Sequence, residues 1–129
     1  MANLKFNPVV WFEIYVEDID RATRFYENVL NIRLEDASDP TNEETQMRFF
    51  PGNMEWHGTG GALVKMKGVK AGGGNVLVYF ACEDCGVEEG RVEAAGGKII
   101  QPKTSIGEHG FCAIVQDTEG NVFGLHSMK

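Results

Sequence analysis

Residues 9–30 read VVWFEIYVEDIDRATRFYENVL, a segment in which the spacing of apolar side chains changes once. Over residues 12–16 an apolar side chain stands at every second position, which predicts a strand with one buried face. The opposite face of this strand carries Trp11, Glu13 and Tyr15. A charged residue in the middle of such a strand face is unusual, which makes Glu13 a candidate for function.

The second part of the same segment predicts an amphipathic helix. From Ile19 to Leu30 the apolar side chains recur every three or four residues and form one stripe. We expect Asp18 or Asp20 to cap this helix, because a short carboxylate accepts the unpaired backbone N–H groups of a first turn.

The same order of elements returns after a glycine-rich linker at residues 70–74. Glu83-Asp84 repeats Glu17-Asp18 at the junction of strand and helix, 66 residues further along (84 − 18). The second helix is expected to run from Asp84 to Ala95. The remaining predicted strands lie at 32–34, 46–50 and 61–67 in the first half, and at 75–82, 98–101, 111–116 and 121–127 in the second.

This repeat predicts one α+β domain over residues 1–129, made of two modules at about 1–69 and 75–129. Each module reads strand, helix and then three strands. The apolar face of each sheet would be buried under its own helix, and the opposite faces would line a cleft for a small molecule.

Charge and composition exclude several classes of partner. The chain has 12 basic against 19 acidic residues and a net charge of −7, which disfavours nucleic acid and anionic membrane surfaces. The longest apolar run, residues 76–82, is too short to span a bilayer. With no apolar leader in its first residues and an odd count of three cysteines, the protein is expected in the cytoplasm with reduced thiols.

Two segments carry a family resemblance. FEIYVEDIDRA at residues 12–22, followed by Phe25-Tyr26, resembles the opening of the vicinal oxygen chelate superfamily, which contains glyoxalase I, bleomycin-resistance proteins and extradiol dioxygenases. Residues 107–127 are similar to a glyoxalase-like bacterial branch. The resemblance implies two βαβββ modules forming a cupped mixed sheet around a cleft, a homodimer, and action on a small metabolite, as in lactoylglutathione lyase and related lyases or isomerases.

Metal-dependent members of that superfamily hold a divalent ion on the first and last strands of each module. Counting from the strand–helix junctions puts the corresponding positions at Trp11, Leu63, Leu77 and Gly124. None of these side chains can coordinate a divalent ion. The cofactor is therefore unknown, and a divalent metal would need other ligands.

A shift of two residues along each strand keeps the same face and brings Glu13, Lys65, Tyr79 and His126 toward the cleft. Glu13 and Tyr79 lie 66 residues apart (79 − 13), and Lys65 and His126 lie 61 apart (126 − 65). These groups could transfer a proton beside a carbonyl, with Glu13 as the base and His126 as the acid or a ligand anchor. Ligand contacts are expected from Trp11, Lys65, Tyr79 and His109.

Two further patterns have competing interpretations. Trp11, Tyr15, Phe50 and Trp56 could form an aromatic wall for a ligand or could pack in the core. Cys82 and Cys85 have the spacing of a redox or zinc motif, but the acidic residues between them disfavour a reactive thiolate.

Three functions stay open on the sequence. One is a lyase or isomerase that uses Glu13 and His126, with or without a metal. Another is a metal-independent protein that binds or sequesters a small molecule. A third is a dimeric accessory domain without a ligand.

Overall fold

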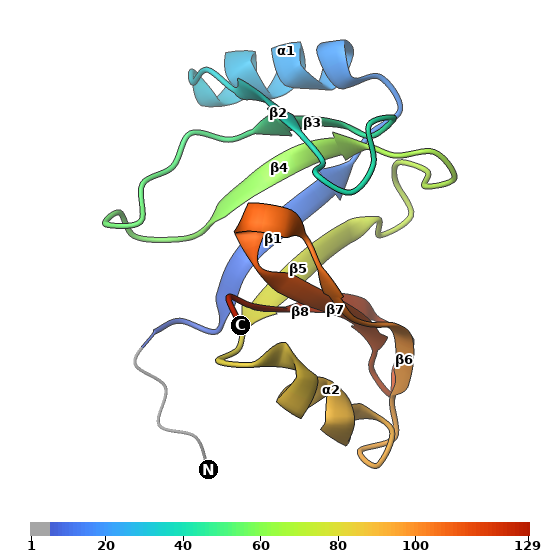
Figure 1. The fold of residues 1–129 in the computed structure, drawn as a ribbon. Helices are drawn as coiled ribbons and strands as arrows, with labels where there is room; N and C mark the ends of the chain where they lie inside the picture. Colours follow the sequence, from blue (N-terminus) through green and yellow to red (C-terminus); the bar gives the residue numbers. More distant parts are fainter. Residues whose placement is uncertain (1–5) are drawn as a thin grey trace. The chain divides into compact units, whose positions relative to one another are not determined.

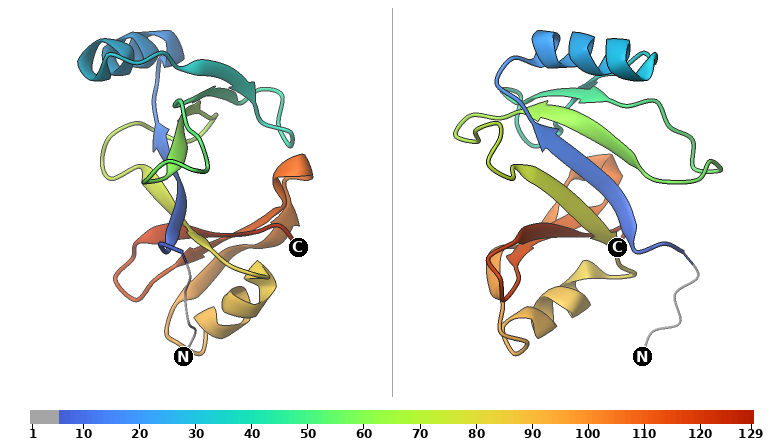
Figure 2. Two further views of the ribbon diagram at one scale, coloured as in Figure 1. Left: turned by 90° about the vertical axis from the view of Figure 1, so that its left-hand side faces the viewer. Right: turned by 180° about the vertical axis from the view of Figure 1, so that it is seen from behind.

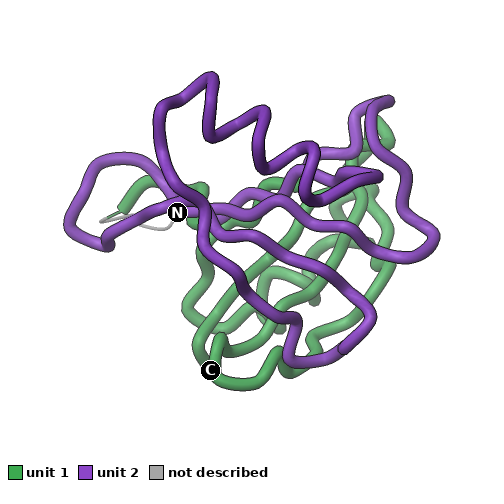
Figure 3. Tube along the Cα trace, turned by 90° about the horizontal axis from the view of Figure 1, so that it is seen from above, with its two compact units in different colours: residues 1–10, 77–129 green, residues 11–76 purple. Residues whose placement is uncertain are grey.

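A computed structural model describes residues 6–129 of the chain. The chain divides into two compact units (Figure 3): unit 2 is Trp11–Val76, and unit 1 is Met1–Val10 with Leu77–Lys129. Each unit is built from one copy of the repeated pattern, so each has its own sheet, helix and core.

Unit 2 has a four-stranded mixed sheet with one helix against it (Figure 1). The strand order is β2-β3-β4-β1, in which β1 is parallel to β4 and the other neighbours are antiparallel. The helix α1 contacts β3 and β4. The elements are β1 (Val9–Tyr15), α1 (Ile19–Leu30), β2 (Glu35–Ser38), β3 (Gln46–Phe49) and β4 (Gly60–Lys65).

Unit 1 repeats this architecture, and Figure 2 shows both units from two further directions. Its strand order is β5-β8-β7-β6, with β5 parallel to β8 and antiparallel pairs elsewhere. The helix α2 contacts β6, β7 and β8. The elements are β5 (Val76–Ala81), α2 (Cys85–Val92), β6 (Lys98–Ser105), the short 3₁₀ helix η1 (Gly107–His109), β7 (Phe111–Gln116) and β8 (Val122–Ser127).

Each unit buries the apolar face of its sheet under its helix, as the alternation predicted. In unit 2 the core consists of Val16, Ile19, Leu34 and Leu63, with Ile14 of β1 packed against it. In unit 1 it consists of Cys85, Ala113, Val115 and Leu125, with Phe80 of β5 packed against it. The α+β class with two strand–helix–three-strand modules is therefore confirmed.

The helix starts follow the predicted caps. Asp18 rather than Asp20 caps α1, with its Oδ1 accepting the Arg21 N–H at 3.0 Å, and this bond lowers the pKa of the Asp18 carboxyl. Asp84 caps α2 by accepting the Gly86 N–H at 3.0 Å. The end of α2 was predicted three residues too late. The helix stops at Val92, and turns lead to Gly96, whose positive φ of 97° suits glycine.

One predicted strand is wrong. Residues 32–34 form no strand, and β2 lies at Glu35–Ser38, where the sequence suggested the start of a loop. Leu34 packs in the core as part of the connection from α1, and its N–H donates to the Glu27 carboxylate at 2.9 Å. Apolar side chains in this segment therefore reflect burial below the helix, whereas the polar β2 pairs with β3 at the edge of the sheet.

Neither helix within residues 6–129 is long and apolar enough to cross a membrane. The first residues, on which the expectation of no leader rests, lie outside the described part of the chain apart from Phe6.

Candidate functional site

The half-buried Glu13 carboxylate lies on the face of β1 that points away from α1. The Tyr15 hydroxyl donates to its Oε1 at 2.6 Å, and the Trp11 indole N–H donates to its Oε2 at 3.3 Å. All three side chains stand on one strand at spacings of two residues, so strand alternation alone puts them on the same face. The two bonds fix the orientation of the carboxylate. The placement of Glu13 and Trp11 on this face matches the prediction.

The Trp11 ring packs edge-to-face with Phe49 of β3, with ring centroids 5.2 Å apart. It also lies over Gly60 of β4, where an added Cβ would stand 3.2 Å from the ring. The expected aromatic wall is only partly present. Phe50 packs against Tyr26 and the core under α1, on the other face, and the sequence analysis did not select Phe49. Trp56 lies in the exposed loop before β4.

The register of β4 overturns the predicted place of Lys65. In the parallel pair, Glu13 stands opposite Ala62 and Ile14 opposite Leu63. Leu63 belongs to the core under α1, and Lys65, two residues further on, is exposed with the same strand parity. Neither therefore shares the face of Glu13, and the residues of β4 that do are Ala62 and Val64.

In unit 1, Tyr79 and His126 lie on the face away from α2, as predicted. Tyr79 pairs with Gly124 and its ring covers that glycine so closely that a Cβ there would overlap it. His126 pairs with Ala81 on β5 and with Cys112 on β7. The neighbouring Leu125 belongs to the core, so His126 must point the other way.

The His126 ring is anchored to the loop that contains His109. Its Nε2 lies 2.6 Å from the His109 carbonyl oxygen. Because a carbonyl can only accept, Nε2 must carry a proton, so the neutral ring has its lone pair on Nδ1. The structure thus brings His109 and His126 together, but through the backbone of His109. The His109 side chain is about half exposed, with its Nε2 3.8 Å from the Glu108 carboxylate.

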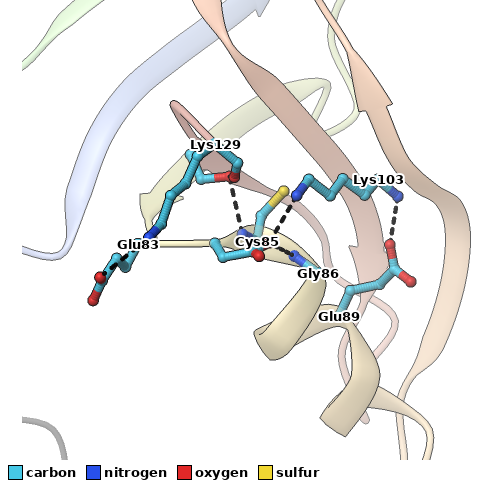
Figure 4. Close-up of polar contacts among 8 residues, drawn as sticks. Glu83, Cys85, Gly86, Glu89, Lys103 and Lys129 are labelled. Carbon is cyan, nitrogen blue, oxygen red and sulfur yellow. Dashed lines mark hydrogen bonds and ion pairs between the residues drawn. The ribbon is translucent and has the colours of Figure 1, made fainter.

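The Cys82–Cys85 segment forms the start of α2 and serves packing (Figure 4). The buried Cys85 N–H donates to the Ser127 hydroxyl at 2.9 Å. Lys103 pairs with the cap residue Asp84 at 2.8 Å, which lowers the pKa of the Asp84 carboxyl, and its ammonium lies 4.8 Å from the centre of the Phe111 ring. Burial, with the nearby Glu88 carboxylate, raises the pKa of the Cys82 thiol to about 12. A thiol of that pKa is a poor nucleophile or metal ligand at neutral pH.

We expect all three cysteines to resist a thiol reagent in the folded protein. Cys85 and Cys112 are buried, and Cys82 stays protonated at pH 8, so little thiolate is accessible. With 5,5′-dithiobis(2-nitrobenzoate) at pH 8, the native protein should react slowly, and three thiols should appear at once in denaturant. Rapid release from the native protein would contradict this account of the segment.

Comparison with known proteins identifies the family. The sequence matches the Glyoxalase/Bleomycin resistance protein/Dioxygenase superfamily over residues 8–125. The chain belongs to this superfamily. No curated protein matches it.

Solved structures of the glyoxalase superfamily share the fold at low identity. A hypothetical protein from Bacillus halodurans is similar with a TM-score of 0.70 and 13% identity, over 94% of each chain. Methylmalonyl-CoA epimerase from Mycobacterium tuberculosis has a TM-score of 0.66 and 13% identity, over 97% of this chain and 90% of its own. The corresponding epimerase from Streptomyces coelicolor, solved with 2-nitronate-propionyl-CoA, has a TM-score of 0.63 and 13% identity, over 92% and 94%.

The divalent ion of metal-dependent glyoxalase relatives does not fit this chain. The positions carried over are Trp11, Leu77 and Gly124, and the β4 register replaces Leu63 by Ala62 on the relevant face. None of these side chains offers a nitrogen, oxygen or sulfur donor for a metal. Among residues 6–129 no group of three or more His, Cys, Asp and Glu side chains is placed to hold a metal ion.

The site residues thus fall into two local groups, Trp11 with Glu13 in unit 2 and Tyr79 with His126 and His109 in unit 1. That the two groups act on one ligand stays a prediction.

Proposed function

We propose that this glyoxalase-superfamily protein acts on a small metabolite by moving a proton beside a carbonyl group, with Glu13 as the base and no divalent metal. The observation that supports this is the Glu13 carboxylate itself. It is oriented by Tyr15 and Trp11 on the face away from α1, while the positions that would hold a metal carry no donors.

The chemistry needs no oxidant or reductant. A Glu13 oxygen takes the proton from the carbon next to the carbonyl, and the electron pair moves onto the carbonyl oxygen to give an enolate. Return of the proton to the other face of that carbon, or to its neighbour, gives an isomer. Elimination of a leaving group from the enolate would make the reaction a lyase.

His126 is assigned to the enolate oxygen or to the ligand as an anchor. With Nε2 bonded to the His109 carbonyl, Nδ1 is the remaining polar atom of the ring. The protonated ring donates from Nδ1 and the neutral ring accepts there, so either role uses the same atom. Tyr79 and Trp11 are proposed to contact the ligand.

The epimerases among the structural relatives add an analogy. An epimerase moves a proton at one carbon, which is the reaction class proposed here. At 13% identity the likeness itself extends only to the fold. A homodimer, which light scattering of the purified protein would detect, is also part of the proposal.

The test follows the proton directly. Purified protein is incubated in D₂O with a panel of small ketones, aldehydes and thioesters, and proton NMR records loss of the signal beside each carbonyl. Wild type should exchange at least one compound, and Glu13→Gln should slow that exchange by about 100- to 10,000-fold, the usual contribution of a general base. His126→Gln should slow it or weaken binding.

Lys65→Met is the matched control, because Lys65 is charged but lies on the face toward α1. It should exchange like wild type, and a chelator should leave wild-type exchange unchanged. Exchange that survives in Glu13→Gln would overturn the proposal, as would a compound that binds without exchanging. The latter result would support the alternative of a metal-independent binding protein.

A further inference from the structure

The four strands of unit 2 distribute their charges unevenly between the two faces. Their basic residues are Arg48 and Lys65. Arg48 reaches the α1 side, where it contacts Thr23 at 3.2 Å and Asp20 at 3.0 Å. Lys65 has the parity of the core residue Leu63. Both cations therefore belong to the face under α1.

The face that carries Glu13 is acidic and has no basic strand residue. Besides Glu13 it includes Glu35 of β2, which pairs with Phe49 and so shares the Trp11 side of the sheet. The whole chain adds a net charge of −7. A ligand bearing a carboxylate or a phosphate would be repelled at this face, and a cation would be attracted.

Aromatic rings surround the carboxylate on the same face. Trp11 and Tyr15 flank Glu13 along β1, and Phe49 lies across Ala62 in the same row, two strand spacings or about 10 Å from it. Trp11 and Phe49 pack against each other and are half-buried, so part of each ring stays accessible in the described unit. The faces of such rings attract ammonium groups, and tryptophan does so most strongly.

We infer that the Glu13 face selects substrates with a positively charged nitrogen, that is, amino-carbonyl compounds. This inference rests on the proposed function and names its substrate class. The ammonium would lie against Trp11 while a Glu13 oxygen takes the proton from the carbon beside the carbonyl. A neighbouring positive charge also stabilises the enolate that forms, and the same proton later returns to carbon, so the step balances.

The test compares three probes of similar shape at pH 7: 2-phenylethylamine, 2-phenylethanol and 3-phenylpropionate. The chain has two tryptophans, so its ¹H–¹⁵N spectrum has two indole signals, and Trp56→Phe assigns the one from Trp11. The amine should shift the Trp11 signal at concentrations about 10-fold or more below the alcohol, and the carboxylate should bind most weakly. Added salt should weaken only the amine.

Glu13→Gln should weaken amine binding by about 10- to 100-fold, the loss expected for a hydrogen bond to a charged partner, and remove the ranking. Glu13→Asp keeps the charge and should keep the ranking, and Lys65→Met should match wild type. Equal or tighter binding of the carboxylate, unchanged amine binding in Glu13→Gln, or no shift of the Trp11 signal by any probe would each overturn the inference.

These outcomes differ from failure of the proposed function. If deuterium exchange does not depend on Glu13 but the amine still binds best, the catalytic role fails and the charge preference stands. If exchange depends on Glu13 but occurs in anionic compounds, the substrate class fails and the catalytic role stands.

Discussion

Leu63→Ala is expected to lower the free energy of unfolding by about 2–5 kcal/mol, the usual range for truncating a buried leucine. Leu63 is fully buried in the middle of β4 and packs with Val16, Ile19 and Leu34 under α1. The core around it is formed by a helix and a sheet that cannot close the space without moving, so a cavity would remain. Urea unfolding followed by circular dichroism measures the loss.

Lys65→Ala is the matched control, because the exposed Lys65 follows on the same strand. Its effect should stay within about 0.5 kcal/mol. Neither change should alter binding of a ligand to the Glu13 face. A Leu63→Ala protein that keeps its stability but loses ligand binding would place Leu63 at the site, and the register described for β4 would then be wrong.

The error over Lys65 has a specific physical cause. Matching positions on β1 and β5 are 66 residues apart, and the sequence set the last strands 61 apart. The pairings show 62, since Glu13 faces Ala62 and Tyr79 faces Gly124 (124 − 62). A shift of one residue moves every side chain to the other face. Residues 61–64 are all buried, so both faces of β4 are apolar and no alternation marks the register.

Where one face of a strand is polar, the sequence was sufficient. The alternation in β1 predicted the faces of Trp11, Glu13 and Ile14, and the aspartates before each helix predicted both caps. The repeat predicted the class of the fold. The contact of His126 with the His109 carbonyl could not be foreseen, because it depends on the path of η1 and not on the type of either residue.

Gly110→Ala is expected to cost about 3–5 kcal/mol, because backbone strain and steric overlap add at this position. Gly110 follows η1 with φ at 98°, a conformation that alanine rarely adopts. A Cβ there would overlap the Ser127 carbonyl oxygen of β8 and lie 3.0 Å from Met128 Cα. Both neighbours are backbone, so relief requires the loop and the end of β8 to separate.

That separation would also release His126, whose Nε2–H is bonded to the His109 carbonyl next to Gly110. Nitrogen NMR of the imidazole should show the Nε2–H tautomer in the wild-type protein and a mixture of tautomers in Gly110→Ala. Gly120→Ala separates strain from overlap: its φ is 85°, but the nearest atom to an added Cβ is Gln116 Nε2 at 3.6 Å. It should cost about 1–2 kcal/mol and leave the His126 signals unchanged. Equal losses in the two variants would mean that the close approach of β8 to Gly110 does not hold the His126 ring in place.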